Sequence, residues 1–124
     1  MEGKFLQERA NEFLENAIDL LSQGRYALSA FNFEQAAQLF LKYFLFTKLG
    51  DFPKTHSLKR LLKEVGEVTN KEKIKVFMEK NADVLANLEN AYLTSRYFPV
   101  EFEKREVENM KDFVEKMNLF LKQL

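Results

Sequence analysis

The 124-residue sequence contains no cysteine and only one histidine, His56. The absence of cysteine excludes disulfides, thiolate nucleophiles and thiolate metal ligands. A zinc site built from protein ligands needs several His or Cys residues, and one imidazole does not supply them. We therefore predict that the protein holds no metal and uses no cofactor.

Glycine is also scarce, and its distribution excludes the common phosphate-binding loops. The four glycines are isolated from one another, at positions 3, 24, 50 and 66. Walker and dinucleotide loops both need closely spaced glycines. His56 and Ser57 are neighbours in sequence, which does not form a catalytic triad. We predict no catalytic residue.

Neither the charge nor the hydropathy of the chain indicates a polyanion or a membrane as its partner. Nineteen Lys and Arg residues balance nineteen Asp and Glu residues, so no net field attracts nucleic acid or anionic lipid. The most apolar stretch, Leu39–Leu49, contains Lys42 and Lys48 and is shorter than the roughly 20 residues that cross a bilayer. No segment of signal-peptide type opens the chain. We expect a cytoplasmic protein with no membrane contact.

Apolar residues recur at helical spacing from Leu6 to Leu21, and Ser22, Gln23 and Gly24 end this first predicted helix. The second predicted helix, Arg25–Lys48, contains no Pro or Gly. Its Phe and Tyr residues point to several sides at about 100° per residue, so the helix must be buried nearly all round.

Gln35, Gln38 and Lys42 interrupt this apolar surface as one narrow stripe, with Glu34 at its edge. Along a helix such spacing places the side chains on one face. We expect the stripe to meet solvent or to line a polar interface.

Breaks and caps define the remaining helices. The residues from Gly50 to Pro53 form a loop, after which Thr55 or Ser57 caps a short helix that ends near Gly66. Asn70 caps a fourth helix.

A bend is predicted in this fourth helix at residues 81–83, and Pro99 precedes a last helix from about Glu101 to Lys122. No Pro, Gly or Ser-rich stretch divides the chain, so residues 1–124 are predicted to form one domain. The predicted fold is all-α, a five-helix antiparallel up-and-down bundle with a short third helix.

The first candidate site is the segment from Lys54 to Lys63, which carries four basic residues and no acidic one. It includes His56 and Lys59 and lies at a predicted helix N-terminus, which favours anions. This segment could bind a phosphate. The alternative is a capped helix with a solvated basic face and a histidine that packs against the cap.

The second candidate site is Arg96, which lies between Tyr92 and Tyr97 at a predicted helix end. Arginine offers a planar fork of donors to phosphate and tyrosine offers a stacking face, so a nucleotide edge could bind here. Equally, Arg96 could cap the last carbonyls of its helix or bind a carboxylate of the last helix.

Three segments share a pattern with a known family. They are residues 24–39 (GRYALSAFNFEQAAQL), residues 53–58 (PKTHSL) and residues 92–97 (YLTSRY). In this order and spacing they resemble the HEPN family, small helical domains often encoded beside minimal nucleotidyltransferases in prokaryotes. The resemblance implies a five-helix bundle that dimerises. It also implies either a nucleotide-binding partner of a nucleotidyltransferase or a toxin-type ribonuclease.

The ribonuclease branch of that family uses an Arg followed, after four to six residues, by a His. Because His56 is the only histidine, the Arg would have to lie at positions 49–51, which are Leu, Gly and Asp. Scanning forward from Arg96 gives Glu, Phe and Glu at positions 101–103. Without an imidazole at the required spacing to share the proton transfers, we expect no RNA cleavage by this mechanism.

We therefore predict a non-catalytic, homodimeric HEPN-like binding module. It would associate with a nucleotide and act with a separately encoded minimal nucleotidyltransferase, as in a toxin–antitoxin pair. The alternatives are a divergent ribonuclease toxin and a plain helical interaction or scaffold domain. The predicted ligand-binding residues are His56, Lys59, Tyr92, Arg96 and Tyr97.

Overall fold

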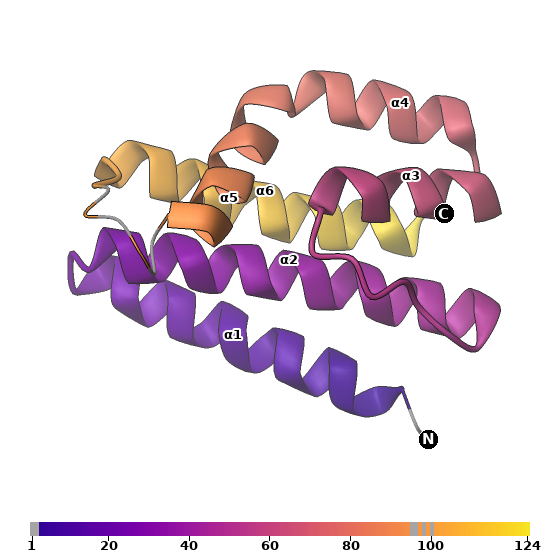
Figure 1. The fold of residues 1–124 in the computed structure, drawn as a ribbon, viewed down its shortest axis with the longest axis horizontal. Helices are drawn as coiled ribbons and strands as arrows, with labels where there is room; N and C mark the ends of the chain where they lie inside the picture. Colours follow the sequence, from indigo (N-terminus) through magenta and orange to yellow (C-terminus); the bar gives the residue numbers. More distant parts are fainter. Residues whose placement is uncertain (1–2, 95–96, 98, 100) are drawn as a thin grey trace.

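The protein is described by a computed structural model that covers residues 3–94, 97, 99 and 101–124. Within this part of the chain there are six α-helices and no strands (Figure 1), which confirms the predicted all-α class. The helices are α1 (Lys4–Ser22), α2 (Tyr26–Leu49), α3 (Leu58–Val68), α4 (Lys71–Lys80), α5 (Ala82–Thr94) and α6 (Lys104–Lys122).

The predicted fourth helix is two helices, because the expected bend is a complete break at Asn81. The side-chain Nδ2 of Asn81 donates to the carbonyl of Phe77 at 2.7 Å, and its backbone N–H donates to Met78 at 3.3 Å. These bonds end α4, and α5 begins at the next residue. The described residues therefore form six helices where the sequence pattern predicted five.

Side-chain caps fix where α3 and α4 begin. Ser57, one of the two predicted caps, accepts a hydrogen bond from the backbone N–H of Arg60 through its Oγ at 3.2 Å. Asn70 accepts from the N–H of Lys73 at 3.0 Å, as predicted. Each bond satisfies a donor that the helix leaves unpaired at its first turn.

Helix α6 begins at Lys104, three residues later than the sequence pattern indicated. Glu103 and Glu106 form a reciprocal capping box there, in which the N–H of Glu103 donates to Glu106 Oε1 at 2.8 Å. A capping box favours the helix start that it encloses.

Helix α2 lies at the centre of the bundle, in contact with α1, α3, α5 and α6. Helix α1 runs antiparallel beside it (Figure 1). Two polar contacts join α1 to α2: Ser29 Oγ donates to the carbonyl of Ala17 at 2.7 Å, and Asn16 Nδ2 donates to Asn32 Oδ1 at 3.0 Å. The neighbouring helices thus cover much of the aromatic surface of α2, and Phe33 is fully buried.

The loop after α2 returns along that helix before α3 begins (Figure 1). Gly50 starts the reversal with φ of 77°, a left-handed conformation that glycine adopts without strain, and its N–H donates to Phe46 at 2.8 Å. The return brings His56 back beside Gln38, eighteen residues earlier in the chain. The candidate site is positioned by this reversal.

In the described part of the chain, every helix is too short or too polar to cross a membrane.

The buried and exposed faces of α2 can be tested with two leucines of the same helix. Leu41 is fully buried, whereas Leu28 is 50% exposed. We expect Leu41→Ala to lower the free energy of unfolding by about 2–5 kcal/mol, because it removes buried methyl groups and leaves a cavity. Leu28→Ala should cost about 1 kcal/mol or less. Urea denaturation followed by circular dichroism measures both, and equal losses would contradict the assigned core face.

Candidate functional site

A buried polar stripe runs along α2 beneath the loop and α5. Glu34 is 0%, Gln38 3% and Lys42 8% exposed, and the three are spaced four residues apart. The stripe was expected to meet solvent or to line a polar interface, but Gln38 and Lys42 are buried against the loop of the same chain. The sequence pattern placed Glu34 at the edge of the stripe and Gln35 within it, but Glu34 is fully buried and Gln35 only half-buried. The sequence feature that indicates this burial is the spacing of four between polar residues in an otherwise apolar helix. Polar groups buried on one such face need hydrogen-bond partners within the protein.

Glu34 is held by two amides. Its Oε1 accepts from Gln35 Nε2 at 2.9 Å, and its Oε2 accepts from Gln38 Nε2 at 2.6 Å. Because Gln38 gives its NH₂ group to Glu34, its carbonyl oxygen faces the other way, toward His56. Gln38 Oε1 lies 3.4 Å from His56 Nδ1.

A hydrogen bond across this contact requires one tautomer of the imidazole. An amide oxygen only accepts, so the tautomer that donates to Gln38 is the one with the proton on Nδ1. Nε2 of His56 is then left as an acceptor. Glu34 thus orients the histidine through Gln38.

His56 also stacks against Tyr92 of α5. The ring centroids lie 5.3 Å apart with an interplanar angle of 20°. His56 is exposed and Tyr92 is half-buried, so the outer part of this pair is accessible. The structure therefore brings together two of the residues that the sequence assigned to separate candidate sites.

The N-terminus of α3, where the sequence suggested phosphate binding, already has acceptors of its own. The backbone N–H of Lys59 donates to Glu89 Oε1 of α5 at 3.3 Å, and that of Arg60 donates to Ser57 Oγ. A phosphate at this helix end would compete with the Glu89 carboxylate. The side chains of Lys59 and Arg60 remain exposed.

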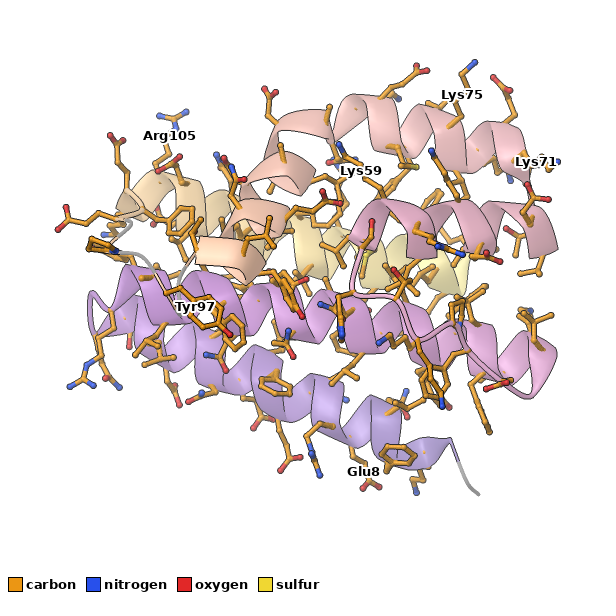
Figure 2. The ribbon with its side chains drawn as sticks, in the orientation of Figure 1. Glu8, Lys59, Lys71, Lys75, Tyr97 and Arg105 are labelled. Carbon is orange, nitrogen blue, oxygen red and sulfur yellow. The ribbon has the colours of Figure 1, made fainter. Side chains whose placement is uncertain are left out.

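The remaining predicted residues are not part of this cluster as described. Arg96 lies outside the residues that the structure describes. Tyr97 is 71% exposed, and its label in Figure 2 is apart from that of Lys59.

Burial controls the charges of the stripe. It raises the pKa of Glu34 from 4.5 to about 7, opposed by the hydrogen bonds from Gln38 and Gln35 and by the nearby charge of Lys42. Glu89 adds to the rise through repulsion. Burial also lowers the pKa of Lys42, whose Nζ lies 5.9 Å from the centroid of the Phe52 ring. Glu34 therefore changes its charge near neutral pH.

The cluster around His56 and Tyr92 offers groups that can bind a ligand. Among the described residues, no three His, Cys, Asp or Glu side chains cluster closely enough to hold a metal ion. What the cluster offers is an exposed imidazole with an acceptor nitrogen, an aromatic platform and a basic helix turn. These groups can bind a donor or a flat ring, and Lys59 can bind an anion.

Comparison with known proteins identifies a family. The model of the HEPN domain matches residues 4–124. A solved structure, the crystal structure of TT1696 from Thermus thermophilus, superposes with a TM-score of 0.79 at 24% sequence identity. The superposition covers 98% of this chain and 96% of that chain, which shows that the two share a fold. No curated protein sequence matches significantly.

The raised pKa of Glu34 predicts how stability changes with pH. Below pH 4.5 the carboxyl is protonated in both the folded and the unfolded state, so burial carries no ionisation penalty. Between 4.5 and about 7 only the unfolded state ionises, and stability falls with rising pH. Above pH 7 the free energy of unfolding is lower by about 3 kcal/mol than below pH 4.5, because a pKa difference of one unit between the folded and unfolded states corresponds to 1.36 kcal/mol.

Glu34→Gln should remove this loss. We expect the free energy of unfolding at pH 8, relative to pH 4.5, to be more favourable in the variant than in wild type by up to about 3 kcal/mol. The difference between the two pH profiles then reports the Glu34 carboxyl together with its coupling to the charges of Lys42 and Glu89. Glu8→Gln, which changes an exposed carboxylate of α1 (Figure 2), is the control. Parallel pH profiles for Glu34→Gln and wild type would contradict the prediction.

Proposed function

The chain belongs to the HEPN family, and from this premise we propose that it is a non-catalytic binding module that holds a nucleotide at His56 and Tyr92. It acts with a separately encoded minimal nucleotidyltransferase, in a pair of the toxin–antitoxin type. The observation that carries the proposal is the exposed His56 ring, which is stacked on Tyr92 and oriented by Gln38.

A nucleotide has the three features that this surface can bind. Its base is a flat ring that can stack on the His56–Tyr92 pair. Its exocyclic amino or hydroxyl groups can donate to Nε2 of His56. Its phosphates can reach Lys59 and Arg60, which extend from the first turn of α3.

Glu89 limits how tightly the phosphates bind. Its carboxylate accepts from the N–H of Lys59 and so lies where a phosphate would meet the positive end of α3. The repulsion between this carboxylate and a phosphate weakens binding. Affinity then depends on the base and on the two basic side chains.

Binding without catalysis is supported by the absence of the Arg–His spacing that the ribonuclease branch of the family uses. His56 is the only imidazole, and positions 49–51 contain no arginine. The hydrogen bond to Gln38 fixes His56 as an acceptor but brings no nucleophile to it. This arrangement suits ligand recognition.

A homodimer is part of the same proposal. Leu28 is 50% and Leu49 is 55% exposed, at opposite ends of α2. Phe31 and Phe44 of the same helix are only half-buried. Apolar surface of this kind on a central helix is typical of an interface between subunits.

The binding site is tested by isothermal titration with ATP, GTP and inorganic triphosphate. We expect ATP or GTP to bind wild type, and His56→Ala and Tyr92→Leu each to weaken this binding about tenfold or more, because each removes half of the stacking platform. Lys75→Ala, which removes an exposed lysine of α4 (Figure 2), should bind as wild type does. Glu89→Gln should bind about fivefold more tightly, because it removes the competing charge.

The outcomes separate the alternatives. If no nucleotide binds, alone or with the nucleotidyltransferase, the nucleotide part is wrong. If inorganic triphosphate binds as tightly as ATP and His56→Ala does not change the affinity, the protein binds phosphate at a site away from His56 and Tyr92. Unchanged affinity in Arg96→Ala removes Arg96 from the site, and RNA cleavage by purified wild type would identify a divergent ribonuclease.

A further inference from the structure

A groove of about 700 Å³ lies between α4, along its whole length, and the last turns of α6. Its floor is aromatic: the rings of Phe77 and Phe120 stack with centroids 4.2 Å apart and an interplanar angle of 6°. Val76, 40% exposed, and Leu119, 62% exposed, extend this apolar surface to the rim. The groove is thus an ordered apolar surface that no part of the described chain covers.

The rim of the groove is positively charged. Lys73 and Lys80 line it from α4 and Lys116 lines it from α6, against one carboxylate, Glu72. All three lysines are exposed, and none forms an ion pair among the residues that the structure describes. The folded protein therefore leaves these charges available to another molecule.

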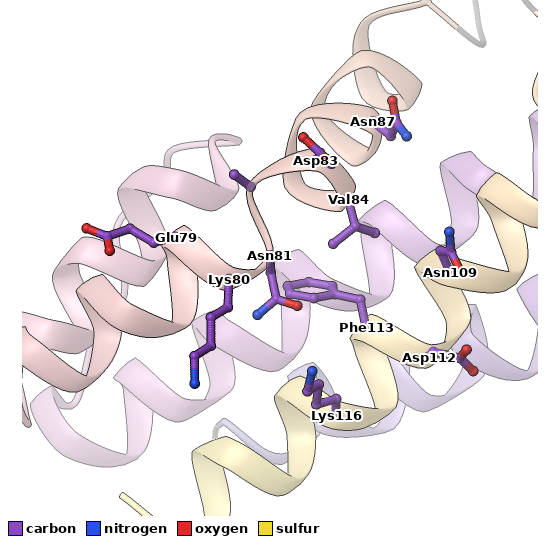
Figure 3. Close-up of a pocket in the computed structure, with 11 residues that line it drawn as sticks. Glu79, Lys80, Asn81, Asp83, Val84, Asn87, Asn109, Asp112, Phe113 and Lys116 are labelled. Carbon is purple, nitrogen blue, oxygen red and sulfur yellow. The ribbon is translucent and has the colours of Figure 1, made fainter.

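The charge changes sign just beyond the groove. Lys80 and Lys116 also border a second hollow of about 390 Å³, which is lined by the carboxylates of Glu79, Asp83 and Asp112. Figure 3 shows the two lysines on one side of the Phe113 ring and Asp83 on the other. Lys80 and Lys116 thus mark the border between the basic rim of the groove and this acidic hollow, in a chain whose net charge is zero.

We propose that this groove docks one amphipathic helix of a partner protein, with an apolar stripe on the Phe77–Phe120 floor and acidic residues along its flanks. A helix laid into a groove is anchored by residues at i, i+3, i+4 and i+7. Lys73 and Lys80 are themselves seven residues apart, about 10 Å along α4 at 1.5 Å per residue. They match two carboxylates two turns apart on a helix that lies beside α4.

Charge argues against the two other occupants. A second copy docked groove to groove would bring three lysines against three lysines, since a two-fold contact uses the same patch on both subunits. An anionic membrane would meet Glu79, Asp83 and Asp112 beside the groove. An acidic helix seated in the groove faces three lysines and one carboxylate, Glu72. The site is separate from His56 and Tyr92, so it does not depend on nucleotide binding.

The proposal is tested with fluorescent helical peptides and measurement of their anisotropy. One probe has leucines at i, i+3, i+4 and i+7 with glutamates on both flanks. The second has the same composition in scrambled order, and the third has lysine in place of every glutamate. We expect the first to bind wild type about tenfold or more tightly than the other two, because only it matches both the floor and the rim.

Variants locate the binding. Lys80→Glu/Lys116→Glu should reverse the preference in favour of the lysine-flanked peptide, and Leu119→Asp should abolish binding of both. Lys4→Glu/Lys104→Glu is the matched control, because it makes the same charge change at two exposed lysines outside the groove and should keep the wild-type preference. Since all four lysines and Leu119 are exposed, these variants should fold, which circular dichroism verifies.

Four results would overturn the proposal. Equal binding of the ordered and scrambled acidic peptides would show attraction by charge alone. Absence of binding by the acidic amphipathic peptide would exclude this occupant. Sedimentation of wild type as a dimer that Leu119→Asp converts to a monomer would assign the groove to a second copy. Binding to phosphatidylglycerol vesicles that the peptide does not displace, but that Lys80→Glu/Lys116→Glu abolishes, would assign it to lipid.

Discussion

The packing of α1, α3, α5 and α6 around α2 is the constraint on which the rest of the structure depends. A helix with phenylalanine on several sides is stable in water only when other helices cover it, and burial of this apolar surface is the main favourable term in folding. Because α2 occupies the centre, every polar side chain on its covered faces must find a partner within the protein. The candidate site is a consequence of that requirement.

Glu34, Gln38 and Lys42 meet the requirement in different ways. Two amides donate to Glu34, and Gln38 in turn accepts from His56 of the loop. Lys42 lies beside the Phe52 ring, and the negative charge of Glu34 attracts its ammonium group. A side chain buried at the centre of the bundle thereby orients an imidazole at its surface. The buried carboxyl and the candidate binding surface are thus joined by the contacts from Glu34 to Gln38 and from Gln38 to His56.

The parts of this structure that the sequence predicted are those that depend on local spacing and caps. Helical periodicity predicted α1 and α2 closely, and Ser57 and Asn70 were recognised as caps because their side chains act within one turn. The complete break at Asn81 was predicted only as a bend. It depends on hydrogen bonds from this residue to the preceding turn, and the apolar pattern does not distinguish such a break from a continuous helix.

Contacts between distant segments could not be predicted from residue spacing. His56 and Tyr92 were assigned to two sites, because their stacking depends on how the loop after α2 folds back. The same return explains why Glu89, thirty residues after Lys59, occupies the end of α3 that seemed open to phosphate.

The account depends most on the claim that Glu34 is sealed beneath the loop and held by Gln38. The most direct measurement is a titration of the Glu34 side-chain carboxyl by ¹³C NMR in the wild-type protein. The account predicts a pKa of about 7 for this carboxyl, because burial outweighs its hydrogen bonds and the charge of Lys42. Titration near the ordinary value of 4.5 would show that water reaches the carboxylate and would contradict the account.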